Sequence, residues 1–176
     1  PIYEFGSFLV SGQEKLADLR PLFPGLEYVG ADMREGPGVD KILDLHDLAL
    51  PAEAAGTVLC LDTLEHVEYP HKAVQEIHRI LDSQGIAILA SVMDFPIHNY
   101  PYDYWRFTPQ SIVRLLSDFS AVQVESFGNV RSATALLEGR AAHEISDSEL
   151  NHVDPDYPVI VAAMARRAGR QQRRPA

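Results

Sequence analysis

The sequence predicts an α/β fold: a doubly wound, mostly parallel sheet of about seven strands with helices on both faces. Short apolar runs alternate along the chain with segments of helical periodicity. Two of these runs, residues 57–61 and 86–92, are almost continuously apolar, which is typical of strands that are covered on both faces. We expect a single domain over residues 1–165, followed by a basic, disordered tail over residues 166–176.

The apolar runs place the strands in order along the chain. They predict strands over residues 2–5, 26–31, 41–44, 57–61, 86–92, 122–127 and 159–165. An acidic, loop-rich insertion is expected between the last two strands.

Three helices are expected between the strands. The first covers residues 13–22, where leucines recur at helical spacing. The second has Pro70 near its start and Gly85 placed to cap its end, with a buried face made by Ala73, Val74, Ile77, Ile80 and Leu81. The third begins with Thr108 as N-cap and Pro109 in its first turn.

Composition narrows the classes of function. The chain has 176 residues and a net charge of −10, which argues against nucleic acid as the main partner. No apolar stretch approaches the roughly 18 residues of a membrane span, so no membrane partner is expected. The single cysteine, Cys60, lies in an apolar strand, so we expect it to be structural and the location to be a reducing cytoplasm.

Polar residues follow the predicted strands at their carboxyl ends, where ligands bind in such sheets. They are Glu4 and Gly6 after the first strand, Asp32 and Met33 after the second, Asp44 and Leu45 after the third, and Leu61 and Asp62 at the end of the fourth. An acid in the position of Asp32 can accept both hydroxyls of a ribose, and Met33 could cover a purine.

The first loop argues against a dinucleotide. A pyrophosphate fingerprint needs G-x-G-x-x-G, and Phe8 stands where the second glycine is required. A phosphate-binding Gly-Lys-Ser loop is also absent from the sequence. The ligand indicated is therefore a nucleoside without a pyrophosphate.

Residues 56–91, GTVLCLDTLEHVEYPHKAVQEIHRILDSQGIAILAS, resemble a known family. The run is similar to the region from the fourth to the fifth strand of class I S-adenosylmethionine-dependent methyltransferases, in the branch that acts on small molecules. The matching residues are Glu65, His66, Pro70, Glu76, Arg79, Leu81 and Gly85. The resemblance extends over roughly residues 2–127 and implies a Rossmann-like fold, S-adenosylmethionine as cofactor and methyl transfer to a small-molecule acceptor.

The resemblance also implies roles for individual residues. Glu4 and Gly6 would face the methionine part of the cofactor, and Asp32 the ribose. Met33 and the pair Asp44–Leu45 would meet the adenine. Leu61 and Asp62 would line the cleft where the methyl group is transferred. The N-terminal helix that precedes the first strand in this superfamily is not in this sequence, which starts at Pro1, so we expect an N-terminal segment to be missing.

Three side chains are candidates for acid–base catalysis. His66 follows the fourth strand, while His98 and Asp103 lie in the loop DFPIHNYPYDYWRFTP at residues 94–109, which resembles a run beside the substrate pocket of related methyltransferases. No metal site is expected, because His143, His152 and nearby acids lack a tight ligand spacing.

Two other functions remain open: a methyltransferase-fold binding subunit that does not catalyse, and a nicotinamide-dependent oxidoreductase. A homo-oligomer or a protein partner also remains open.

Overall fold

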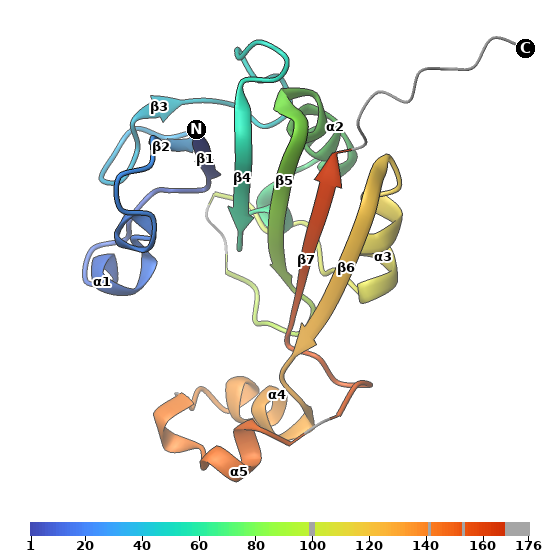
Figure 1. Ribbon diagram of the computed structural model, residues 1–176. Helices are drawn as coiled ribbons and strands as arrows, with labels where there is room; N and C mark the ends of the chain where they lie inside the picture. The colour runs from blue at the N-terminus through green and yellow to red at the C-terminus, as the bar shows by residue number, and fades with distance from the viewer. Residues whose placement is uncertain (99–100, 141, 153, 168–176) are drawn as a thin grey trace, which may run out of the picture.

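The computed structural model describes residues 1–98, 101–140, 142–152 and 154–167. Seven strands form one sheet in the order β3-β2-β1-β4-β5-β7-β6 (Figure 1). They are β1 (Ile2–Phe5), β2 (Tyr28–Asp32), β3 (Lys41–Ile42), β4 (Ala55–Leu61), β5 (Leu81–Val92), β6 (Phe119–Phe127) and β7 (Ile160–Arg167). All neighbours are parallel except β7, which runs antiparallel to β5 and β6. The predicted α/β fold with a mostly parallel sheet of seven strands is confirmed. The expectation that residues 86–92 are covered on both faces is wrong, because Ile88 in β5 is 37% exposed.

The strand order reverses between β1 and β4. From β1 the chain moves outward to β2 and β3, and it then returns to β4 on the other side of β1. In open α/β sheets this switch point opens a crevice at the carboxyl ends of the strands. The ends of β1, β2 and β4 therefore mark the place where a ligand site is expected.

Two helices pack on the sheet beside each other. Helix α2 (Pro70–Ile80) contacts β5, α3 (Pro109–Leu115) contacts β6 and β7, and the two helices also touch (Figure 1). The apolar face predicted for the second helix is buried, and Thr108 caps α3 by accepting a hydrogen bond from the backbone of Ser111. The apolar positions of α2 thus have a partner surface, whereas in α3 Ile112 is buried and Val113 is 50% exposed.

The β1–β2 crossover differs from its prediction. Instead of one helix over 13–22 it contains α1 (Glu14–Ala17) and the 3₁₀ helix η1 (Arg20–Leu22), neither of which has a buried residue. Pro21 cannot donate a backbone hydrogen bond and disfavours helical backbone in the residue before it. Leu16 and Leu22, with the expected helical spacing, are 88% and 70% exposed. The predicted apolar stripe finds no surface to cover.

Gly85 does not cap α2. The helix ends at Ile80, and Leu81 is already in extended conformation as the first residue of β5. Gly85 lies in β5 where the pairing with β4 is irregular, and a Cβ atom at this position would come within 2.9 Å of the Leu81 side chain. The absence of a side chain at Gly85 therefore leaves room for the Leu81 side chain.

The β6–β7 insertion contains α4 (Val130–Leu137), the 3₁₀ helix η3 (Ala142–Glu144) and α5 (Asp147–Leu150), which Figure 1 shows beyond the ends of β6 and β7. Arg166 and Arg167 belong to β7, so the strand takes the first two residues of the predicted tail. The rest of that tail, 168–176, lies outside the described residues.

Within the described part of the chain, no helix is long and apolar enough to cross a membrane. Cys60 is buried in β4, and burial raises the pKa of its thiol. A protonated thiol in an apolar strand is a poor nucleophile, in agreement with the structural role predicted for it.

Candidate functional site

The end of β1 carries a buried acid and a glycine that the backbone requires. Glu4 accepts a hydrogen bond of 2.6 Å from the Tyr28 hydroxyl, and burial raises the pKa of its carboxyl. Gly6 has φ +85°, and a Cβ there would lie 2.0 Å from Oγ1 of Thr63. The loop after β1 therefore lies directly against the loop after β4, which only glycine permits.

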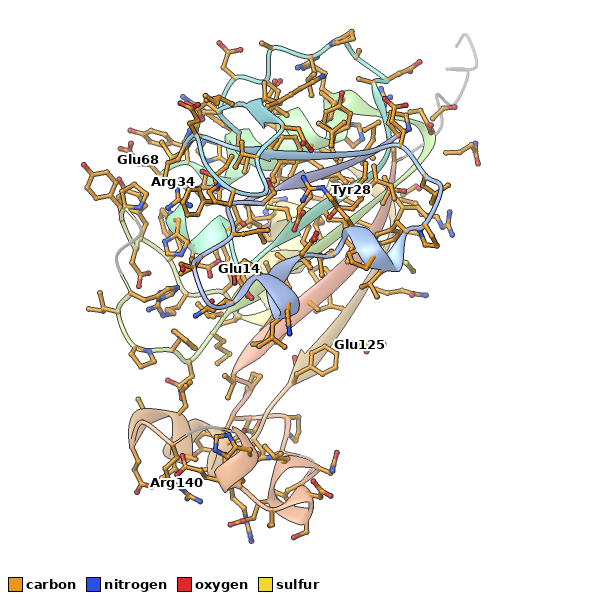
Figure 2. All side chains as sticks on the ribbon, turned by 90° about the vertical axis from the view of Figure 1, so that its left-hand side faces the viewer. Glu14, Tyr28, Arg34, Glu68, Glu125 and Arg140 are labelled. Carbon is orange, nitrogen blue, oxygen red and sulfur yellow. The ribbon has the colours of Figure 1, made fainter. Side chains whose placement is uncertain are left out.

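The end of β2 carries Asp32, whose carboxylate is buried and already bonded. Nε and Nη2 of Arg34 donate to its two oxygens at 2.9 and 3.2 Å, and the Arg34 backbone N–H donates to Oδ1. Tyr28 and Arg34 lie at opposite ends of this strand (Figure 2). Met33, next to Asp32, is 60% exposed and free to cover a flat ligand. The acid predicted for the ribose thus has an arginine as its present partner.

Phe8 packs on the same loop. The Arg34 guanidinium lies 4.5 Å from the centre of the Phe8 ring, and a Cβ on Gly36 would meet this ring at 2.2 Å. The phenyl ring therefore packs against the turn after β2, next to Arg34.

The residues after β3 differ in exposure. Asp44 is exposed and accepts hydrogen bonds from the backbone and the ring of His46, at 2.8 and 2.7 Å, while Leu45 is buried in the core. Of this predicted pair, Asp44 is therefore accessible to a ligand.

The end of β4 places Asp62 in a rare backbone conformation. Its φ is +46°, in the left-handed region that costs a residue with a side chain about 1 kcal/mol or more. Asp62 is exposed at the surface, but the surrounding atoms remove its carboxyl partly from water. This desolvation and the charge of Glu65 raise the pKa of the carboxyl, while His98 and His66 act in the opposite direction. The chain turns sharply at Asp62, directly after Leu61, the last residue of β4.

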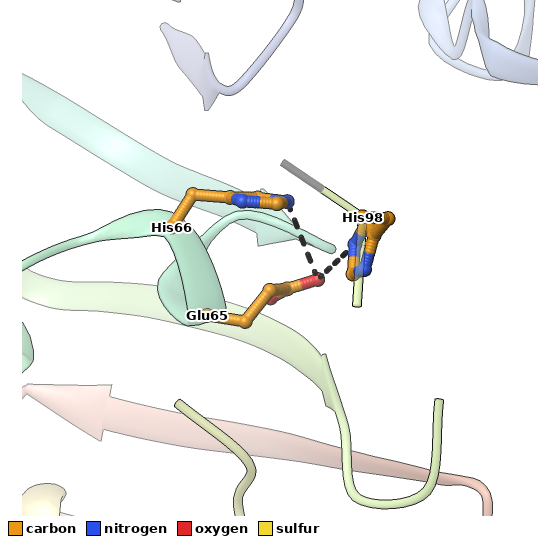
Figure 3. Close-up of side chains that lie close together, drawn as sticks. All are labelled: Glu65, His66 and His98. Carbon is orange, nitrogen blue, oxygen red and sulfur yellow. Dashed lines mark ion pairs between the residues drawn. The ribbon is translucent and has the colours of Figure 1, made fainter. Parts of the chain in front are cut away.

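The 3₁₀ helix η2 (Leu64–His66) follows this turn and buries Glu65 completely. Oε2 of Glu65 accepts a 2.6 Å hydrogen bond from Ser91 at the end of β5, and Oε1 makes no hydrogen bond to any described residue. Nε2 of His66 lies 4.0 Å and Nε2 of His98 3.9 Å from Oε1 (Figure 3). Glu65 and His98, distant in sequence, thus meet at the ends of β4 and β5.

Asp103 holds the loop that carries His98. It accepts a hydrogen bond from the His98 backbone at 2.9 Å and lies 3.2 Å from Nδ1 of that ring. Both its oxygens also bind Arg106, and this pairing holds the pKa of the carboxyl well below its usual range. Asp103 is therefore a permanent anion that positions His98, and it is too weak a base to take a proton near neutral pH.

The same loop is attached to η2 through its backbone. The N–H groups of Tyr104 and Trp105 both donate to the carbonyl oxygen of Glu65, at 2.8 and 3.1 Å. Phe107 is buried in the core, whereas Trp105 is 44% exposed, so packing explains the first of these aromatic residues but not the second. These bonds fix the position of the loop relative to η2 and hold His98 near Glu65.

The structure brings the candidates together in two groups. The first lies at the ends of β1, β2 and β4 and could hold a nucleoside; the second lies at the ends of β4 and β5 and contains Glu65, His66 and His98. The buried carboxylate of Glu65 was not among the predicted site residues. The sequence signal that could have indicated Glu65 is its position directly before His66. Its contact with His98, 33 positions away, can be recognised only in the folded structure.

Comparison with known proteins bears on the kind of domain and on the fold. The family model described as a methyltransferase domain matches residues 23–89. No curated protein sequence matches the chain.

Solved structures share the fold at low sequence identity. A SAM-dependent methyltransferase from Archaeoglobus fulgidus has a TM-score of 0.62 at 16% identity, covering 94% of this chain and 85% of that one. The [4+2]-cyclase SpnF has a TM-score of 0.64 at 17% identity, covering 95% and 74%. A putative methyltransferase in complex with the Haloferax volcanii Trm112 activator has a TM-score of 0.61 at 14% identity, covering 97% and 83%. These likenesses show the fold.

Proposed function

We propose that this chain is a member of the class I S-adenosylmethionine-dependent methyltransferase superfamily, that it binds S-adenosylmethionine at the ends of β1, β2 and β4, and that it methylates a small molecule. The observation that carries the proposal is the position of Asp32. A buried carboxylate at the carboxyl end of β2, beside the point where the strand order reverses, is suited to accept the two hydroxyls of a ribose.

The neighbouring residues fit an adenosine. Met33 is exposed next to Asp32 and can lie against the adenine, and Asp44 is accessible after β3. Binding requires the Arg34 guanidinium to give up its hydrogen bonds to Asp32, because the ribose hydroxyls need the same oxygens. The sulfonium supplies the methyl group, and the chain supplies alignment and exclusion of water.

The acceptor would enter beside the second group. His66 and His98 are the candidate bases for an acceptor that carries a proton, while Asp103 acts as a positioning residue for His98. Leu61 and Asp62 lie between the two groups, where a methyl group would pass. The net charge of −10 supports a small-molecule acceptor over a nucleic acid.

Calorimetric titration tests the proposal. S-adenosylmethionine and S-adenosylhomocysteine should bind the wild-type chain with one site, and NAD should not. Loss of a charge-assisted contact in Asp32→Ala should weaken binding by about 2 kcal/mol, or roughly 30-fold. Asp156→Ala, an exposed acid in the β6–β7 insertion, is the matched control and should bind as the wild type does. A change of less than twofold in Asp32→Ala would show that the ribose site is assigned wrongly.

The arginine on Asp32 favours a second candidate, a binding subunit that keeps the fold without catalysis. Arg34 occupies the carboxylate, and Phe8 stands at a position where the fingerprint has glycine. One structure with this fold is a complex with an activator protein, and another is a cyclase. For this candidate, S-adenosylhomocysteine would fail to bind the isolated chain, or would bind only with a partner present.

The oxidoreductase alternative makes a different prediction, since only it requires NAD to bind in the titration.

We propose a cytoplasmic location for this chain, supported by its one cysteine, which is buried and unpaired.

A further inference from the structure

We propose that Glu65, His66 and His98 form a binding site for one divalent transition-metal ion, of the zinc or iron class. One nitrogen of each ring and one carboxylate oxygen lie within 4.8 Å of one another (Figure 3). The site lies at the ends of β4 and β5, beside Asp62.

The first argument is the orphaned oxygen of Glu65. The side chain is fully buried, yet Oε1 has no hydrogen-bond partner among the described residues, while Oε2 is satisfied by Ser91. A buried carboxylate oxygen without a partner costs about 1–3 kcal/mol or more. Such an atom needs a donor or a cation, and the two imidazole nitrogens that face it stand at 4.0 and 3.9 Å, too far for a hydrogen bond.

The second argument is the tautomer of each ring. Nδ1 of His66 is bonded to the carbonyl oxygen of Tyr102, and Nδ1 of His98 faces the carbonyl oxygen of Pro96 at 3.1 Å and the Asp103 carboxylate at 3.2 Å. These partners only accept, so each neutral ring carries its hydrogen on Nδ1. Both Nε2 atoms then carry a lone pair, and three atoms with lone pairs within 4.8 Å of one another attract a cation.

The surroundings have the form of a metal site. In such sites the ligating histidine commonly donates its other N–H to a carbonyl or a carboxylate, which fixes the ring. His66 and His98 both do so, and Arg106 in turn anchors the Asp103 carboxylate.

The spacing is close to what a metal requires. Metal–ligand bonds of about 2.0–2.2 Å place ligand atoms roughly 3.0–3.4 Å apart. The two Nε2–Oε1 separations of 3.9 and 4.0 Å must therefore shorten by about 0.5–1 Å, and the separation of the two ring nitrogens, which lies within 4.8 Å, by up to about 1.8 Å. His98 lies in a loop and is partly exposed, so a shift of this side chain can supply most of the change.

The donor set selects the metal and its use. Two imidazoles and one carboxylate suit zinc, iron, cobalt or nickel better than calcium or magnesium, which prefer oxygen. Three protein ligands leave at least one position open, as in catalytic rather than structural sites. If the proposed methyl transfer holds, this position would take an oxygen or nitrogen of the acceptor and lower its pKa, and His66 and His98 would then act as metal ligands instead of general bases.

Metal titration tests the site without any methyl acceptor. Protein freed of metal by a chelator is titrated with Zn²⁺ by calorimetry and with Co²⁺ by visible absorption. We expect one equivalent to bind with a dissociation constant in the micromolar range or below. His98→Ala, on the half-exposed loop, and Glu65→Gln should each weaken binding at least about tenfold. His71→Ala removes an exposed histidine of α2 and should bind as the wild type does.

The outcomes separate this proposal from the proposed function. The metal site is overturned if the wild type takes up no stoichiometric Zn²⁺, or if His98→Ala, shown to be folded by circular dichroism, binds as tightly as wild type. S-adenosylhomocysteine is titrated into the same samples. Metal binding without this ligand would leave the metal site standing and contradict the cofactor site, and the reverse result would do the opposite.

Discussion

Removal of the arginine from Asp32 should strengthen cofactor binding. In Arg34→Ala the carboxylate loses the donors at 2.9 and 3.2 Å and becomes available to the ribose hydroxyls. A hydrogen bond to a charged group contributes about 1.5–3 kcal/mol. The Arg34 side chain is 32% exposed, however, so water already offsets part of this energy. We therefore expect a gain of about 1 kcal/mol, or roughly fivefold tighter binding of S-adenosylhomocysteine.

The assay is calorimetric titration, supported by thermal unfolding with and without ligand. Without ligand, the variant should melt earlier than the wild type, because a buried carboxylate has lost its counter-charge. With saturating ligand, its melting temperature should rise by more than that of the wild type. Arg131→Ala, whose guanidinium lies 4.0 Å from Glu149 far from the site, is the matched control. Weaker binding in Arg34→Ala would refute the reasoning and make Arg34 a ligand-binding residue.

Other substitutions test separate parts of the site. Phe8→Gly should also tighten ligand binding despite the added loop entropy, and weaker binding would make the ring part of the pocket wall. His66→Gln should lower turnover about 10²-fold or more, with the affinity for the cofactor nearly unchanged. Normal turnover together with a lower melting temperature would show that His66 only stabilises the loop after β4. Gly6→Ala should cost about 1–3 kcal/mol in urea unfolding, because its Cβ would strike Thr63; wild-type stability would contradict the close approach. Burial raises the Glu4 pKa above its ordinary value of 4.5, so the folded chain binds the proton of this carboxyl more tightly than the unfolded chain does. The free energy of unfolding therefore falls as the pH rises from the unfolded pKa to the higher folded pKa. Glu4→Gln should lose less stability between about pH 4 and pH 7, and an unchanged profile would contradict the shift.

The elements that the sequence predicts well are those whose pattern and packing agree. The helix at α2 has a stripe of apolar residues, and the sheet supplies a surface for each of them. The segment 13–22 has similar spacing, but the helix ends at Ala17, where Asp18 becomes extended, and no surface covers Leu16. Local periodicity therefore predicts an element only where the fold provides a partner for its apolar face.

The strand ends could be placed from the sequence because parallel strands bring their carboxyl ends to one edge. The side chains that contact the residues at these strand ends could not be predicted from the sequence. The ion pair between Arg34 and Asp32 depends on the side-chain conformation of Arg34, although the two residues are only two positions apart in the chain. The contact of Glu65 with His98 depends on how the loop after β5 folds back over η2, through hydrogen bonds between distant residues. Such contacts have no local sequence signature.

A crystal structure with S-adenosylhomocysteine would locate the cofactor, which we place at the ends of β1, β2 and β4. We expect density for the ribose hydroxyls on both oxygens of Asp32, with the Arg34 guanidinium displaced and Met33 against the adenine. The thioether should point toward Asp62. Density for the ligand at another place, or a bound ligand with the Asp32–Arg34 pair still intact, would show that this cofactor site is assigned wrongly.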